Sequence, residues 1–236
     1  VLCYERTPRT MRDEVWRFLC GLVDRVAERW QEPDQGPWEL RKPASHHVYS
    51  KLFCWVAFDR ALRLARSEHL PADFDAWERA HAAIREAILT RGYDTQQHAF
   101  VQAFDAPVLD ASVLALPLAG LLPAHDPRVR STVARLRERL SVDGLMYRYR
   151  EDDGLDGHDS TFTLCSFWLV RVLARAGQQD EARAIFERIL AHANDVGLLS
   201  EQIDPTRGAL LGNFPQGFAH LGLIRAALDL DGGGDV

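Results

Sequence analysis

Two glutamates stand out because each lies in a loop beside residues suited to binding a polar ligand. Glu39 follows Trp38 a short way after a Gly-Pro pair, and Glu201 is followed by Gln202 shortly before a proline. Two carboxylates brought together from distant loops can divide the roles of general acid and general base if their surroundings differ. We therefore expect these glutamates to meet across a pocket as a catalytic acid and base.

The neighbours of the two glutamates indicate which role each would take. Trp38 gives Glu39 an apolar flank, which favours the protonated form that an acid needs. The amide of Gln202 could orient a substrate hydroxyl or a water molecule beside Glu201. The plainer interpretation, a solvated loop carboxylate, stays open for both residues at this point.

A third loop carries charges between aromatic rings. Arg148 lies between Tyr147 and Tyr149, and Asp152 follows shortly before a glycine. Such residues could hold sugar hydroxyls, although a surface charge cluster is an equally good interpretation. The aspartates near Gly154 miss the spacing of an EF-hand loop, and the histidines lack zinc-site spacing. We therefore expect no metal ion and no cofactor.

Apolar residues recur at helical spacing in about eight segments, and no convincing alternating strand pattern is found. Segments with one apolar stripe alternate with segments that are apolar nearly all round, as buried helices are. The sequence therefore predicts an all-α fold. The expected helices cover about 11–30 with Thr10 as its N-cap, 49–65, 74–88, 110–120 with a kink at Pro117, 127–140, 161–176, 179–194 and 215–228.

The longer connections are expected to share one face of the molecule. They run over about 33–48, 93–108, 141–160 and 195–214, each from a striped helix to a buried one. Alternate loops between antiparallel helices emerge at the same end, and loops of this length are usually functional. Buried helices inside and striped helices outside describe an α-toroid of helical hairpins.

Four hairpins do not close such a ring, so we expect either an open arc or a ring whose upstream hairpins are missing. Residues 1–230 are expected to form this partial toroid as a catalytic domain, and the Gly-rich residues 231–236 a disordered tail. The oligomeric state is not indicated.

Composition excludes several classes of function. The 236 residues carry a net charge of -6 and no basic run, which argues against a nucleic-acid partner. No signal peptide or apolar membrane-spanning run is present, so no membrane partner is expected. The four cysteines form no C-x-x-C pair, which is typical of thiols in a reducing cytoplasm, and we expect a cytoplasmic location.

The chain resembles glycoside hydrolase family 15, the glucoamylase-like enzymes that include trehalases. The resemblance covers about residues 33–228 and rests on motifs in the family's order. The general-acid region is similar at Gly36-Pro37-Trp38-Glu39-Leu40-Arg41, His47-Val48-Tyr49-Ser50-Lys51 and Trp55-Val56-Ala57-Phe58-Asp59-Arg60. The general-base region is similar at Ser200-Glu201-Gln202-Ile203-Asp204, a substrate-binding stretch at Arg148-Tyr149-Arg150-Glu151-Asp152, and the start of the last helix at Leu211-Gly212-Asn213-Phe214-Pro215-Gln216.

The resemblance implies an (α/α)6 toroid, of which this chain would supply about the last four hairpins. It also implies inverting hydrolysis of an α-glucosidic bond in α-glucan, maltooligosaccharide or trehalose, with Glu39 as the acid and Glu201 as the base. Inversion needs roughly 6.5–9.5 Å between the carboxyl groups, which leaves room for the attacking water. The sugar-binding residues it implies are Trp38, Arg41, Arg148, Asp152 and Gln202.

Two other functions stay open. A helical-hairpin scaffold without catalytic activity could bind a glycan or a protein on the face that carries the long loops. Another toroid enzyme acting on sugars, a lyase or an epimerase, would recruit a histidine or tyrosine base, for which His46, His47 and Tyr149 are candidates.

Overall fold

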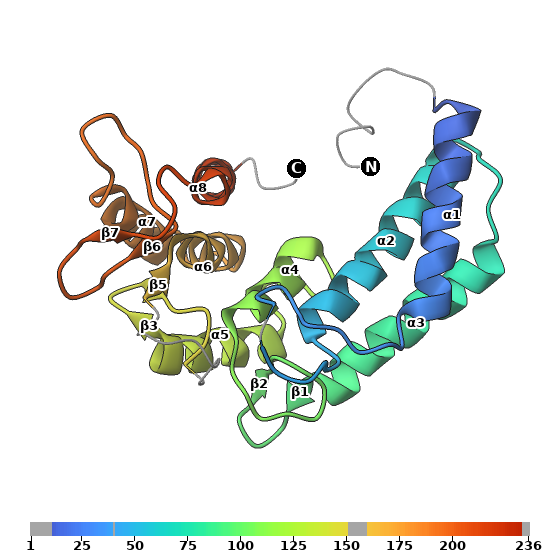
Figure 1. Cartoon of the computed structure of the whole chain (residues 1–236), viewed down its shortest axis with the longest axis horizontal. Coiled ribbons are helices and arrows are strands. Elements are labelled where there is room, and N and C mark those ends of the chain that lie inside the picture. Colours follow the sequence, from blue (N-terminus) through green and yellow to red (C-terminus); the bar gives the residue numbers. More distant parts are fainter. Residues whose placement is uncertain (1–10, 40, 151–159, 233–236) are drawn as a thin grey trace. The chain divides into compact units, whose positions relative to one another are not determined.

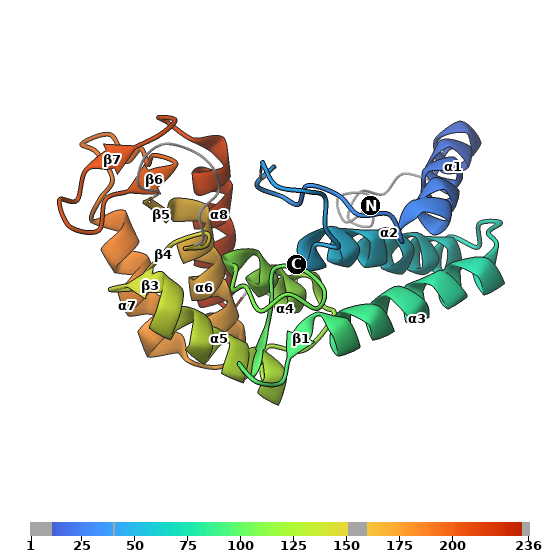
Figure 2. The same ribbon diagram turned by 60° about the horizontal axis from the view of Figure 1, so that its bottom comes forward.

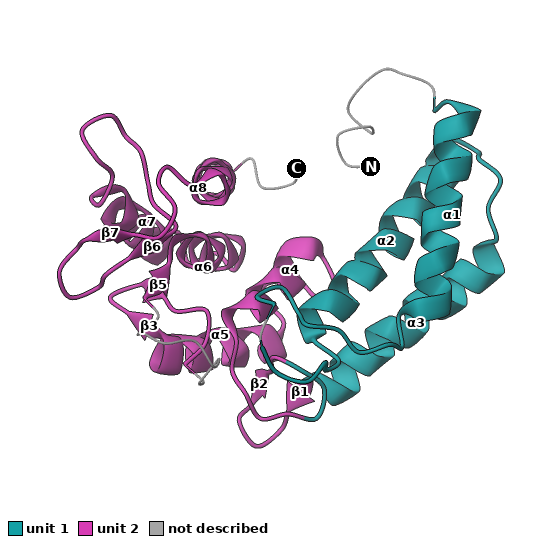
Figure 3. Ribbon diagram, viewed as in Figure 1, with its two compact units in different colours: residues 1–92, 103–105 teal, residues 93–102, 106–236 magenta. Residues whose placement is uncertain are grey.

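Eight α-helices dominate the part of the chain that this computed structural model describes, residues 11–39, 41–150 and 160–232 (Figure 1). The chain divides into two compact units (Figure 3). Unit 1 comprises residues 1–92 and 103–105, and unit 2 comprises residues 93–102 and 106–236. The fold is all-α, as the sequence predicted. None of the described helices is long and apolar enough to cross a membrane.

Unit 1 contains three helices, α1 (Asp13–Arg29), α2 (Val48–Ser67) and α3 (Phe74–Arg91). Acidic residues in the first turn of α1 and Arg29 in its last turn complement the helix dipole. The side chain of Asp73 accepts a hydrogen bond from the backbone of Ala76 and so caps α3. α2 is the most buried of the three, although Phe53 on its surface is exposed, contrary to the expectation of an all-round buried helix.

Two tryptophans fix α1 against α3. The indole Nε1 of Trp16 donates to the carbonyl of Pro71 at 2.8 Å, and that of Trp77 donates to Asp24 Oδ1 at 2.8 Å. The two rings meet edge to face with their centroids 6.1 Å apart. Because both N–H groups are satisfied, these large rings can be buried without an unpaired donor.

Unit 2 contains five helices and seven two-residue strands among its described residues. They are β1 (Tyr93–Asp94), β2 (Ala99–Phe100), the 3-10 turn η1 (Ala111–Leu114), α4 (Ala115–Ala119), α5 (Pro127–Leu140), β3 (Ser141–Val142), β4 (Leu145–Met146), β5 (Thr161–Phe162), α6 (Thr163–Arg175), α7 (Gln179–Leu190), β6 (Gln202–Ile203), β7 (Leu210–Leu211) and α8 (Gly217–Leu230). The strands pair in antiparallel fashion within the long connections, as β1–β2, β3–β4 and β5–β6–β7.

α6 forms the centre of unit 2 and runs between α7 and α8 (Figure 2). Its side chains are buried on nearly every side, including Phe167, Leu169 and Val170. The pairing of β5 with β6 brings the connection before α6 next to the connection before α8. Two of the four long connections therefore meet at this pairing.

Two predicted helices differ from the structure. The segment 110–120 is not one kinked helix, because η1 precedes a short α4. Pro117 lies in the first turn of α4, where its missing N–H is not needed. α8 buries only one side, and a stripe of exposed apolar residues covers its other side. This stripe comprises Phe218, Leu221, Ile224 and Leu228.

A buried ion cluster joins α6 to α8. Asp229 accepts a hydrogen bond from Arg171 Nε at 2.6 Å and forms an ion pair with Arg175 at 3.1 Å. The side chains of Asp229 and Arg171 are only 3% and 10% exposed. Burial lowers the pKa of Arg171, and the hydrogen bond to Asp229 opposes that change. The negative charge of Asp229 therefore stabilises the buried positive charge of Arg171.

We expect the substitution Asp229→Asn to destabilise the protein by about 3–5 kcal/mol, because it leaves the buried Arg171 without its counter-ion. The measurement is denaturant unfolding of the intact protein, followed by tryptophan fluorescence. The matched control is Glu28→Gln, which removes an ion pair with Arg25 whose side chains are 63% and 64% exposed. A change at Asp229 no larger than that at Glu28 would contradict the prediction.

Candidate active site

The connection that carries Glu39 is closed at its base by backbone hydrogen bonds. The backbone groups of Asp34 and Ser45 donate to and accept from each other at 2.9 Å in both directions. Trp38, Glu39 and Arg41 lie on the loop between these two residues. The loop is thus a closed segment of unit 1 rather than an open connection.

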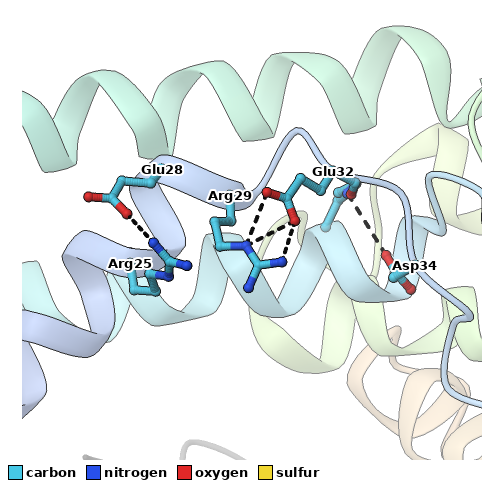
Figure 4. A network of polar contacts seen from close by, with 6 residues as sticks. Arg25, Glu28, Arg29, Glu32 and Asp34 are labelled. Atoms are coloured by element: carbon cyan, nitrogen blue, oxygen red, sulfur yellow. Dashed lines mark hydrogen bonds and ion pairs between the residues drawn. The ribbon is translucent and has the colours of Figure 1, made fainter.

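Asp34, labelled in Figure 4, also organises the inside of this loop. Its Oδ1 accepts hydrogen bonds from the backbone of Gly36 at 2.7 Å and from Ser50 Oγ at 2.6 Å. Lys51 Nζ lies 3.9 Å from Asp34 Oδ2 and donates to the carbonyl of Glu32 at 2.5 Å. The Lys51 side chain is 2% exposed, and this burial lowers its pKa. A buried lysine on α2 therefore holds the start of the loop.

The loop backbone takes unusual conformations around the glutamate. Gly36 has a φ of +68°, and a Cβ at this position would lie 2.8 Å from the ring of His47. Glu39 itself has a φ of 51°, which is uncommon for a residue other than glycine. The Glu39 side chain is exposed and that of Trp38 is half-buried. The turn thus presents the carboxylate to solvent beside a partly covered indole ring.

Glu201 lies in unit 2, immediately before β6. Its carbonyl accepts from the backbone of Thr163, and its N–H donates to the carbonyl of Asn213, each at 2.9 Å. Its carboxylate Oε2 accepts two hydrogen bonds from Asn213, at 3.0 Å from the backbone N–H and at 2.8 Å from Nδ2. The side chain is half-buried. Both the backbone and one carboxylate oxygen of Glu201 are therefore fixed.

Two further predicted binding residues lie near Glu201 in unit 2. Gln202 pairs with Phe162 across β5 and β6. The guanidinium of Arg148 lies over the rings of both Phe162 and Tyr149, with 5.3 Å to each centroid. The structure therefore places Arg148 and Gln202 around one phenylalanine next to Glu201. Asp152, the remaining predicted binding residue of this loop, lies outside the described residues.

Sequence reasoning missed the residues that hold the two glutamates. Asp34, Ser50 and Lys51 support the Glu39 loop, and Asn213 holds Glu201. The Asp-x-Gly spacing at the first of these is typical of a turn that an aspartate side chain closes. Within the described ranges, no group of three or more His, Cys, Asp or Glu side chains is placed to hold a metal ion.

Curated relatives of this chain are trehalases. The chain is 39% identical over 228 residues to the "Trehalase" of Thermoplasma acidophilum, covering 96% of this chain and 39% of that protein. It is 41% identical over 219 residues to the "Trehalase" of Mycobacterium tuberculosis, covering 92% of this chain and 32% of that protein. The chain therefore spans between about a third and two fifths of the length of these relatives.

Glucoamylases are among the solved structures with a similar fold. The glucoamylase of Saccharomycopsis fibuligera matches with a TM-score of 0.74 at 16% identity, over 90% of this chain and 60% of that one. A bacterial glucoamylase complexed with acarbose matches with a TM-score of 0.74 at 16% identity, over 92% of this chain and 39% of that one. At this identity the likeness shows the fold, which is of the (α/α)6-toroid type, as predicted.

A match to a family model covers most of the chain. The model for "Glycosyl hydrolases family 15" matches residues 4–228, which include both predicted glutamates and all five predicted sugar-binding residues. The trehalase relatives and the glucoamylase fold agree with it. This chain belongs to glycosyl hydrolase family 15.

Proposed function

We propose that this chain is the C-terminal portion of the catalytic domain of an inverting α-glucosidase, and that its substrate is trehalose. The observation that carries the proposal is the fixing of the Glu201 carboxylate, whose Oε2 takes two hydrogen bonds from Asn213. Family membership and the trehalase relatives support hydrolysis of a glycosidic bond in trehalose. Short maltooligosaccharides and α-glucan are the alternative substrates.

In the proposed reaction, the Glu39 carboxylic acid donates its proton to the glycosidic oxygen as the bond from that oxygen to C1 breaks. Glu201 takes a proton from a water molecule whose oxygen forms the new bond to C1 on the opposite face of the sugar. Trehalose and one water thus give two glucose molecules. No metal or cofactor takes part in these steps.

The remaining predicted residues are proposed to bind the sugar. Trp38 and Arg41 lie on the same loop as Glu39. Arg148 and Gln202 lie around Phe162, next to Glu201. Their indole ring, guanidinium groups and amide suit a ligand with apolar ring faces and many hydroxyl groups. Asp152 is kept in this group on the family resemblance.

The cytoplasm is the proposed location. Cys20 and Cys54 form no disulfide, which fits a reducing compartment.

We expect Glu39→Gln and Glu201→Gln, each made in the intact protein, to lower the rate of glucose release from trehalose by about 10²- to 10⁴-fold, because each removes a proton-transfer group. Glu138→Gln is the matched control, since Glu138 is an exposed partner of Arg135 on α5. Undiminished rates in both glutamine variants would contradict the assignment of the two glutamates. Absence of glucose release from the unsubstituted protein, with sugar binding retained, would favour the non-catalytic scaffold instead.

An aryl α-glucoside separates the two roles. Its phenolate leaving group needs little protonation, so Glu39→Gln should lose much less activity on it than on trehalose. Glu201→Gln should lose about the same on both substrates, because the water still needs a base. Equal losses for the two variants on both substrates would contradict the assignment of acid and base.

The stereochemistry tests inversion directly. Inverting hydrolysis of α,α-trehalose releases one β-glucose and one α-glucose per molecule, whereas retention releases only the α form. Proton NMR of the first products, recorded before mutarotation, should show both anomers in equal amounts.

The choice of substrate is tested by comparing kcat/KM on trehalose and on maltose. We expect the value to be higher on trehalose; the reverse order would assign the protein to maltooligosaccharides.

A further inference from the structure

The hairpin formed by β6 and β7 places Asn213 beside the side chain of Glu201. Gln202 pairs with Leu211 and Ile203 pairs with Leu210, so the residues before β6 and after β7 face each other. Beyond the strands, the backbone N–H of Glu201 donates to the carbonyl of Asn213 at 2.9 Å. The hairpin is therefore complete without the contacts that Asn213 makes to the Glu201 carboxylate.

Those contacts concern a single carboxylate oxygen. Oε2 of Glu201 accepts from Asn213 N at 3.0 Å and from Asn213 Nδ2 at 2.8 Å. Among the described residues, Oε1 receives no hydrogen bond from the protein. One oxygen of the carboxylate is thus held in place.

Gly212 makes this geometry possible. A Cβ at residue 212 would lie 2.7 Å from Glu201 Oε2 and 3.1 Å from Glu201 Cβ, so any side chain there would displace the carboxylate. The residue also has a φ of +72°, a conformation that favours glycine. Gly212 therefore leaves room for the Glu201 carboxylate, and Asn213 supplies the hydrogen-bond donors that hold it.

We infer that Asn213 is a positioning residue for Glu201, and that Gly212 provides the room for it. This inference rests on the proposed function, in which Glu201 is the general base. Hydrogen bonds donated to a carboxylate favour its ionised form, which a general base must have. With Oε2 fixed by Asn213, Oε1 is the oxygen that takes the proton from the attacking water.

Other titratable groups also lie in this part of unit 2 among the described residues. The guanidinium of Arg148 lies over Phe162 on β5, the partner strand of β6. Asp204 lies in the turn after β6, where the Thr206 hydroxyl lowers its pKa. His220 on α8 accepts from the backbone of Leu199 through Nε2. None of the three donates to Glu201 in the structure, so Asn213 is the group to test.

The test is the pH dependence of kcat/KM for trehalose in the intact protein carrying Asn213→Asp. This substitution keeps the size and the backbone N–H but replaces the Nδ2 donor with a carboxylate. We expect the acidic limb of the profile to move up by about one pH unit or more, because a like charge disfavours ionisation of Glu201. The alkaline limb, which reports the acid, should stay where it is.

Asn213→Ala is expected to lower kcat/KM by about 10- to 100-fold, the effect of losing one hydrogen bond to a charged group. Most of the loss should fall on kcat. Gly212→Ala should lower activity further while the circular dichroism spectrum is unchanged. The matched control is Thr206→Ala, which removes the Thr206 Oγ1 bond to Asp204 in the same hairpin but touches neither Glu201 nor Asn213.

An Asn213→Asp variant whose pH profile matches that of the unsubstituted protein would overturn the inference. Equal losses in Asn213→Ala and Thr206→Ala, with unchanged profiles, would do the same, because they would assign Asn213 to hairpin stability alone. Glu201→Gln is measured alongside: full activity in that variant would overturn the proposed function itself, whereas its inactivity combined with an unshifted Asn213→Asp profile would overturn only the positioning role.

Discussion

The structure depends on hydrogen bonds that hold loops whose functional side chains must stay in contact with solvent. A loop that presents a carboxylate to water cannot be fixed by burying that side chain, so polar contacts must replace apolar packing. In unit 1 this role falls to Asp34, which binds the backbone of Gly36 and the hydroxyl of Ser50. Lys51 adds a buried charge beneath the loop, at the cost of desolvation.

Unit 2 meets the same constraint in a different way. The β5–β6–β7 ladder fixes the backbone on both sides of Glu201, and Asn213 fixes its side chain. α6 follows β5 directly, so the position of the ladder depends on the most buried helix of the unit. The buried contacts between Asp229 and Arg171 hold α8 to that helix. The chemistry proposed for Glu201 therefore rests on a rigid core.

Local periodicity was sufficient to predict most helices, because the apolar residues of a stripe are only three or four positions apart in the sequence. It failed where the outcome depends on contacts far along the chain. The nearly all-round apolar pattern of α8 does not indicate that Phe218 is exposed while Ala219 is buried. Sequence motifs predicted a role for both glutamates. The bond from Asn213 to Glu201 could not be predicted, because it depends on how β6 and β7 pair, and two-residue strands are too short to show an alternating pattern.

The surroundings of the two glutamates differ, since Glu39 is exposed and Glu201 is half-buried. A general base must be ionised and a general acid protonated at the same pH, so identical surroundings would serve neither role. Glu201 has two hydrogen-bond donors of Asn213 aimed at one carboxylate oxygen. Glu39 lies on a left-handed turn beside the indole of Trp38, a neighbour without a formal charge. The proposed roles of Glu201 as base and Glu39 as acid make use of this difference.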